Sequence, residues 1–183
     1  MHTLHCQDSF NLVETSFGRK GSRMITVGLA DDHIIVRQGL RLLLETDREF
    51  KVIGEAANGT EALELVKRLK PDVMILDLMM PSPGGLEVTR RIARQKLATR
   101  VIILTMYGDD VFVMDALKGG ATGFLVKESC GTDLFDAVRE VAAGRRYLSP
   151  SLATVVENWT ATTRKAARLR RAVRSPRPAS LPS

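Results

Sequence analysis

Three carboxylates in this sequence directly follow apolar runs that are typical of buried strands. Asp77 follows the unbroken run 73–76, and Asp31 and Asp32 follow the run 24–30. Ligand and reaction sites of open α/β sheets lie beyond the carboxyl ends of the strands. Carboxylates gathered there would repel one another, so either their pKa values rise or a hard cation such as Mg²⁺ binds among them. An isolated Asp77 would more simply start a turn, but three acids in register favour a site.

Two further polar residues end the next two expected strands. Thr105 ends the run 100–105, and Lys127 follows the run 122–126. An anion held at Asp77 would therefore meet a hydroxyl donor and a positive charge. Taken alone, Thr105 is a strand-favouring residue and Lys127 is a solvated lysine, so their shared position at strand ends carries the functional interpretation.

The pattern that must position these residues alternates short apolar runs with amphipathic stretches. It predicts strands at 24–30, 51–56, 73–76, 100–105 and 122–126, and helices at 34–45, 60–69, 86–94, 109–118 and 132–143. Asn58-Gly59 predicts a turn, after which Thr60 caps the second helix. Five such units imply a doubly wound, five-stranded parallel sheet with helices on both faces. In the flavodoxin-like order 2-1-3-4-5 the first and third strands are neighbours, which would bring the three acids together.

Composition and charge indicate a soluble globular body with a basic tail. The chain has 183 residues, is 44% apolar and 26% charged, and carries a net charge of +6. Seven Lys/Arg and no acid lie in 162–183, which leaves 20 basic and 21 acidic residues elsewhere. We predict a linker or short helix at 144–161 and a disordered basic Pro/Ser-rich tail at 162–183.

Residues 1–23 show no steady period and predict a disordered leader, or an upstream start before Met24. His2, His5 and Cys6 resemble metal ligands at a glance, but a frayed terminus is the simpler interpretation. Two cysteines are too few for a disulfide framework, and no apolar run is long enough for a signal sequence or a membrane span. We therefore expect a cytoplasmic protein without a membrane partner.

Four stretches together resemble the receiver domain of two-component response regulators, in the subfamily that carries a LuxR-type helix-turn-helix. They are 31–40, 72–81 with Gly85, 101–106 and 120–127. The resemblance covers residues 24 to about 148, and it is specific because all four stretches occur together.

The resemblance implies a mechanism. A sensor histidine kinase would present a phosphohistidine to Asp77, the phosphoacceptor. Mg²⁺ would be held by Asp32, by Asp77, by the Met79 carbonyl and, through water, by Asp31. Lys127 and Thr105 would bind phosphoryl oxygens, and Phe124 would turn inward as Thr105 moves. The fourth and fifth helices would then repack and offer a homodimer surface.

The sequence departs from the family pattern in places. Glu128 stands where many receivers have Pro, Gly84 replaces an acid common in related loops, and Pro83 stiffens that turn. Only about 35 residues follow Leu148, without a helix-turn-helix pattern. The tail is therefore interpreted either as a remnant or as a basic segment that binds DNA weakly and non-specifically.

These features are compatible with three candidate functions to different degrees. The first is a phosphoacceptor receiver acting through protein partners, without turnover of an external substrate. The second is a truncated transcription factor whose tail binds DNA. The third, a phosphatase with an Asp nucleophile, usually carries Asp-x-Asp after the first strand, a spacing that Asp31-Asp32-His33 lacks.

Overall fold

The computed structural model describes residues 23–106 and 110–152. In chain order the elements are β1 (Ile25–Ala30), α1 (Ile34–Glu45), β2 (Phe50–Ala56), α2 (Gly59–Leu69), β3 (Val73–Asp77), α3 (Gly85–Arg94), β4 (Arg100–Thr105), α4 (Asp110–Gly119), β5 (Gly123–Val126), the 3-10 helix η1 (Lys127–Ser129), α5 (Cys130–Ala142), β6 (Tyr147–Leu148) and the 3-10 helix η2 (Pro150–Leu152). The leader and the tail expected from the sequence lie outside the described residues.

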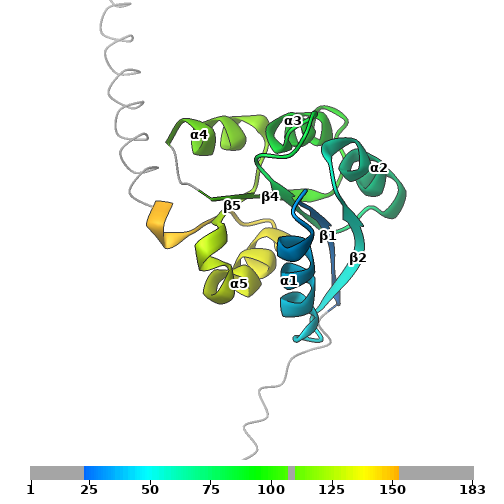
Figure 1. The fold of residues 1–183 in the computed structure, drawn as a ribbon, viewed down its shortest axis with the longest axis vertical. Helices are drawn as coiled ribbons and strands as arrows, with labels where there is room; N and C mark the ends of the chain where they lie inside the picture. The colour runs from blue at the N-terminus through cyan, green and yellow to red at the C-terminus, as the bar shows by residue number, and fades with distance from the viewer. Residues whose placement is uncertain (1–22, 107–109, 153–183) are drawn as a thin grey trace, which may run out of the picture.

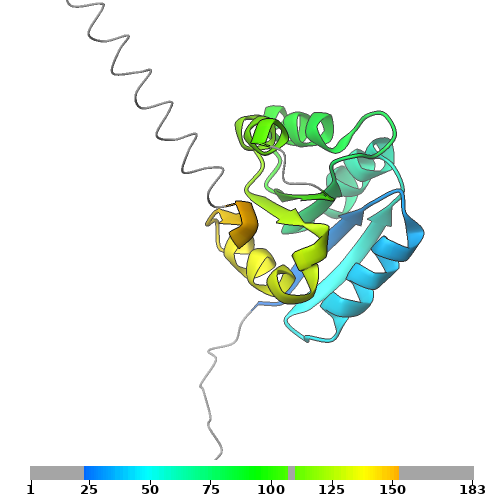
Figure 2. The same ribbon diagram turned by 60° about the vertical axis from the view of Figure 1, so that its left-hand side comes forward.

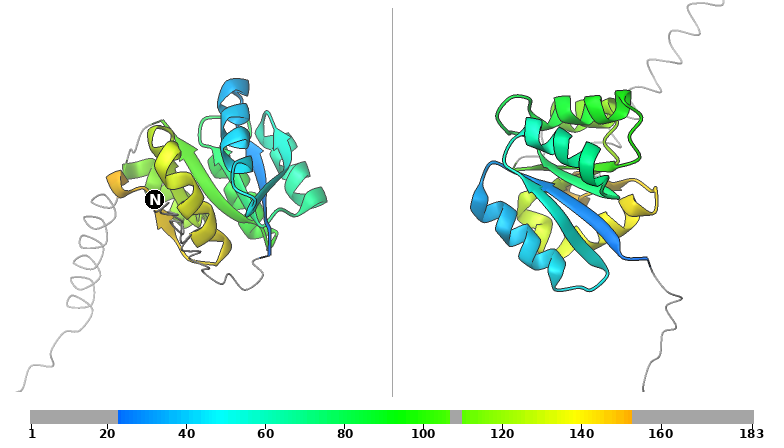
Figure 3. Two further views of the ribbon diagram at one scale, coloured as in Figure 1. Left: turned by 90° about the horizontal axis from the view of Figure 1, so that it is seen from below. Right: turned by 90° about the vertical axis from the view of Figure 1, so that its right-hand side faces the viewer.

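The strands form one parallel sheet in the order β2-β1-β3-β4-β5-β6. Helices α2, α3 and α4 cover one face, and α1 and α5 cover the other (Figures 1 and 3). The doubly wound fold and the order of the first five strands are thus confirmed. Because β1 and β3 are neighbours, the residues that follow them lie at the same edge of the sheet.

The sheet separates two hydrophobic cores, and the inner strands contribute alternate residues to each. Met74 and Leu76 of β3 face the core under α2, α3 and α4, whereas Val73 and Ile75 face the core under α1 and α5. These four side chains are at most 1% exposed. Burial on both faces explains why the strand is an unbroken apolar run.

The start of α2 differs from the expectation. The N-cap is Asn58, whose side chain accepts a hydrogen bond from the Glu61 backbone N–H at 3.0 Å, so Thr60 lies inside the helix. The Glu61 carboxylate returns to the Ala57 backbone N–H at 2.8 Å. Asn58 therefore caps the helix, and the Glu61 carboxylate binds back to the backbone before it. The prediction of a turn followed by a Thr60 cap was wrong.

The end of the described chain also differs from the expected linker. Tyr147–Leu148 forms a sixth strand beside β5, and the segment continues through η2, drawn in orange in Figure 2. Leu152 is 2% exposed and packs in the same core as Phe124. Residues 147–152 are therefore packed against the sheet; the remainder of the expected linker lies outside the described residues.

A charged and aromatic cluster joins the loop before β2 to α5. The Arg139 guanidinium lies 2.8 Å from Asp47 Oδ2 and 2.8 Å from Glu49 Oε2. It also lies 5.2 Å from the ring centre of Phe50, which stacks on Phe135. This cluster connects segments 90 residues apart in sequence.

We expect Arg139→Ala to lower the free energy of unfolding by about 1–2 kcal/mol, because three ion pairs and a cation–π contact are lost together. Urea unfolding measures the change. The control is Arg91→Ala, which removes an exposed pair with Glu87 on one helix and should cost less than about 0.5 kcal/mol. Equal losses in the two variants would contradict the prediction.

Candidate functional site

The carboxyl ends of β1, β3 and β5 bring four charged side chains together. Lys127 Nζ lies 2.8 Å from Asp31 Oδ2 and 3.2 Å from Asp77 Oδ2. Asp32 follows Asp31 at the same edge, and its side chain is 31% exposed. The structure therefore gathers the three predicted acids around the predicted lysine.

The two inner carboxylates are almost completely buried. Asp31 is 1% and Asp77 3% exposed, whereas the Asp32 and His33 side chains reach solvent. Asp31 Oδ1 accepts a hydrogen bond from the His33 backbone N–H at 2.8 Å, and Asp77 Oδ1 lies 3.4 Å from the Met79 backbone N–H. The backbone thus fixes one oxygen of each acid, while the other faces the lysine.

Burial and the Asp31 charge raise the pKa of Asp77, although Lys127 acts against this shift. For Lys127, burial alone would lower the pKa, but contact with Asp31 and Asp77 outweighs burial and raises the pKa. The lysine therefore stays charged, and one positive charge is shared between two buried carboxylates. The site is electrostatically suited to receive more positive charge.

The pairing of β4 with β3 and β5 places Thr105 at the same edge of the sheet as this cluster. Thr105 ends β4, is 3% exposed and pairs in register with Val126, the residue before Lys127. Phe124 is fully buried in the core beside α4, and its role as a switch stays a prediction. The Met79 side chain is 70% exposed, and the role of its carbonyl stays a prediction.

Sequence reasoning missed two residues at this edge. His33 Nδ1 lies 2.9 Å from Asp32 Oδ1, and its position next to the two acids was a signal that could have found it. Ser149 is fully buried; its hydroxyl lies 3.2 Å from the Val126 backbone N–H and 3.0 Å from Ser129 Oγ. It fastens the turn that carries Lys127, and no local sequence signal points to that contact.

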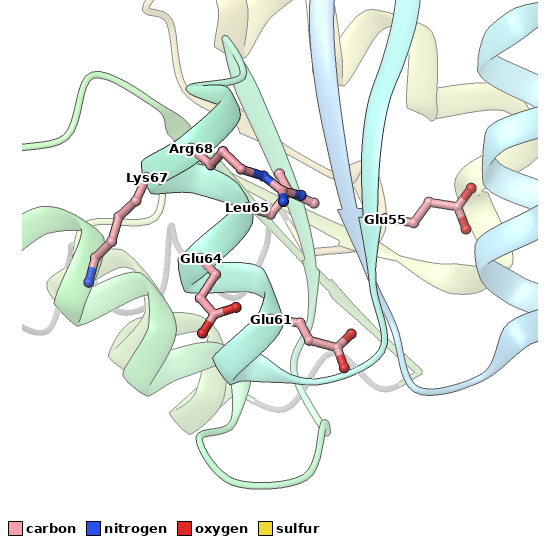
Figure 4. A pocket seen from close by; sticks show the side chains of 6 residues that line it. All are labelled: Glu55, Glu61, Glu64, Leu65, Lys67 and Arg68. Atoms are coloured by element: carbon pink, nitrogen blue, oxygen red, sulfur yellow. The ribbon is translucent and has the colours of Figure 1, made fainter.

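A second polar feature of the described residues does not bring its charges together in this way. A surface hollow of about 440 Å³ lies beside α2 and β2 (Figure 4). Two of its acids are already engaged, since Glu55 pairs with Arg37 and Arg41 and Glu61 caps α2. Figure 4 shows its charged side chains pointing in different directions.

The thiol of Cys130 is buried and poorly suited to act as a nucleophile. Burial raises its pKa to about 11, which disfavours the thiolate that would act as a nucleophile.

A doubly wound sheet with an acidic cluster and a paired lysine at its carboxyl edge is the arrangement expected of a receiver domain. The model of the response regulator receiver domain family matches residues 27–139. The chain belongs to this family, which confirms the resemblance.

Individual proteins similar to this chain support its membership of this family. The chain is 39% identical over 129 residues to the transcriptional regulatory protein YdfI of Bacillus subtilis, covering 70% of this chain and 60% of that protein. Among solved structures, a LuxR-family two-component response regulator from Aurantimonas sp. SI85-9A1 is 38% identical with a TM-score of 0.70, covering 74% of this chain and 97% of that chain. The isolated receiver domain of RcsB from Salmonella enterica serovar Typhimurium, solved with the phosphomimetic BeF3−, is 28% identical with a TM-score of 0.66, covering 72% of this chain and 97% of that chain.

The chain spans about 60% of the length of the curated relatives it matches. In the part of the chain that the structure describes, no helix has the length and apolar character needed to span a membrane.

The loop after Asp77 depends on a close backbone approach at Gly85. A Cβ added there would lie 2.3 Å from the Asp77 carbonyl oxygen, whereas one added at Gly84 would be no closer than 3.6 Å to its neighbours. The Gly85 backbone N–H also donates to the Leu78 carbonyl at 3.2 Å. Gly85 therefore lets α3 begin directly against the strand that carries Asp77.

We expect Gly85→Ala to lower the free energy of unfolding by about 2 kcal/mol or more, because backbone atoms must move. Gly84→Ala is the matched control and should cost less than about 1 kcal/mol, the loss typical of an N-cap change. Urea unfolding of both variants measures the difference. If Gly85→Ala were as stable as Gly84→Ala, the close approach would not constrain the loop.

Proposed function

We propose that this receiver accepts a phosphoryl group on Asp77 from the phosphohistidine of a sensor histidine kinase and changes conformation in response. The observation that carries the proposal is the shared contact of the Lys127 ammonium with the buried Asp31 and Asp77 carboxylates. It is supported by the family match and by the RcsB receiver structure, which contains a phosphomimetic.

In this proposal an Asp77 carboxylate oxygen attacks the phosphorus and forms an O–P bond. The P–N bond of the phosphohistidine breaks, and its electron pair stays on the imidazole nitrogen. Lys127 Nζ lies 3.2 Å from Asp77 Oδ2, which supports its proposed role in binding the phosphoryl oxygens. Thr105 lies at the adjacent strand end and donates its hydroxyl to another oxygen.

The residues also fit a divalent cation. Asp31 Oδ2 is buried and meets no described donor with hydrogen-bond geometry, although Lys127 lies close to it. Asp32, Asp77, the Met79 carbonyl and, through water, Asp31 would hold Mg²⁺, a cation that prefers oxygen ligands. The bound cation would supply positive charge that offsets the negative charge of the transferring group.

The conformational response is proposed to pass through Phe124. Phosphorylation adds about −1.5 to −2 charge, which Thr105 and Lys127 would then bind. Phe124 lies in the same hydrophobic core as Val113 and Ala116 of α4 and Leu152. A shift of Thr105 would therefore reach α4 and the segment that leaves the sheet.

Protein partners suit the surface around the site. Ile34, Ile35, Met79 and Met106 are apolar side chains at least 52% exposed, and all follow the carboxyl ends of strands. Exposed apolar groups at one edge are typical of protein docking surfaces. We propose that the sensor kinase docks on this exposed apolar edge. In the switched state a homodimer would form through α4 and α5. The protein is proposed to act in the cytoplasm.

The proposed output is regulation of transcription, as the name of YdfI states for that relative. The alternative is weak, non-specific DNA binding by the basic tail, whose residues lie outside the described part of the chain. No turnover of an external substrate is proposed. In a gel-retardation assay, equal binding of a promoter fragment and a random fragment, lost when salt is added, would favour non-specific binding.

We expect incubation with acetyl phosphate and Mg²⁺ to add about 80 Da to the intact chain, the mass of one phosphoryl group. Asp77→Asn should remove the increment because the attacking oxygen is lost, and Lys127→Ala should slow its appearance at least tenfold. Intact-mass spectrometry over time gives both results.

The control is Asp115→Asn, which removes an exposed carboxylate on α4 away from the cluster and should leave the rate unchanged. An unchanged mass in the wild-type chain, or an increment that persists in Asp77→Asn, would exclude Asp77 as the phosphoacceptor.

A further inference from the structure

His33 lies at the mouth of the acidic cluster, between β1 and α1. Its Nδ1 atom lies 2.9 Å from Asp32 Oδ1 and 3.2 Å from Asp31 Oδ1. The side chain is 67% exposed, so it can approach a cation that enters from solvent. The receiver mechanism proposed above gives this imidazole no role.

The geometry allows the imidazole to share a cation with the acids. One ligand atom each from Asp31, Asp32, His33 and Asp77 can be chosen so that all four lie within 4.8 Å of one another. Opposite ligands of an octahedral Mg²⁺ are about 4.2 Å apart. A contraction of this group around one ion would bring Asp32, His33 and Asp77 to ligand distance, with Asp31 bound through water.

A second observation points to a ligand at this place. Asp31 is 1% exposed, and its Oδ2 atom meets no described hydrogen-bond donor in good geometry. Lys127 Nζ is 2.8 Å from that oxygen, but Lys127 is shared with Asp77. A buried oxygen that is only partly compensated is what an entering cation would satisfy.

We propose that His33 Nδ1 is a nitrogen ligand of the divalent cation at this site, so that cations that accept imidazole gain a contact there that Mg²⁺ does not use. Imidazole suits Co²⁺, Ni²⁺ and Zn²⁺, whereas carboxylate, carbonyl and water suit Mg²⁺. The inference rests on the proposed function, because it assigns a ligand to the same cation site. It makes cation identity, as well as cation presence, a property set by this chain.

The competing role of His33 is that of a charged neighbour. A protonated imidazole between Asp31 and Asp32 would repel any entering cation. Removing it would then strengthen binding of Co²⁺ and Mg²⁺ by the same factor. Loss of a ligand would instead weaken Co²⁺ and leave Mg²⁺ nearly unchanged, so the two cations together separate the roles.

The test uses the full chain carrying His2→Ala, His5→Ala and Cys6→Ser, because these residues could bind Co²⁺ themselves. Calorimetric titration gives the dissociation constants of Co²⁺ and Mg²⁺ with and without His33→Ala. We expect His33→Ala to weaken Co²⁺ about tenfold or more, a loss that even an outer-shell partner of a metal ligand can produce. Mg²⁺ should change less than about twofold, and the visible absorption of bound Co²⁺ should shift.

Asp32→Asn is the matched control on the neighbouring residue. It removes an oxygen ligand that both cations share, so it should weaken Co²⁺ and Mg²⁺ together. Equal changes for both cations in His33→Ala, with Mg²⁺ binding intact in the parent chain, would overturn the His33 proposal alone. Absence of any Mg²⁺ binding in the parent chain would overturn the cation site on which the proposed function relies.

Discussion

Two buried carboxylates share a single ammonium group at the carboxyl edge of the sheet, and the rest of the site depends on that imbalance. Asp31 and Asp77 each contact Lys127, while Asp32 adds a third negative charge beside them. Burial and Asp31 together raise the pKa of Asp77, which shows that its charged form is disfavoured in the folded chain. An entering cation can therefore make an interaction that the resting protein leaves incomplete.

The charged residues can meet only because three separate strands, β1, β3 and β5, end at the same edge of the sheet. β1 and β3 are paired, and the β3–β4–β5 ladder extends from Asp77 to the turn of Lys127. The acids tolerate burial because each is held at one oxygen by a backbone N–H. Ser149 secures the turn of Lys127 from the far side of β5, so the end of the described chain also supports the site.

Much of this arrangement could be predicted because strong periodicity and strand-end acids report directly on a parallel sheet. The runs before Asp77 and Thr105 are unbroken because those strands are buried on both faces. The sequence could not show β6, since two residues carry no periodicity and their pairing is set by β5. Asn58 was misassigned because Asn-Gly is also a turn signal, and only the returning Glu61 carboxylate distinguishes the cap. Ser149 depends on tertiary proximity, which spacing alone does not encode, whereas His33 was missed although it directly follows the two acids in the sequence.

The most direct measurement of the central claim is the free energy of unfolding of Asp77→Asn against the wild-type chain, with and without Mg²⁺. If the site holds uncompensated negative charge, the substitution should stabilise the metal-free protein, because a buried charge with a raised pKa is removed. Adding Mg²⁺ should stabilise the wild type more than the variant, since cation binding to the folded state adds to its stability. A variant that is less stable than the wild type without Mg²⁺, with no difference in the response to the cation, would contradict the account.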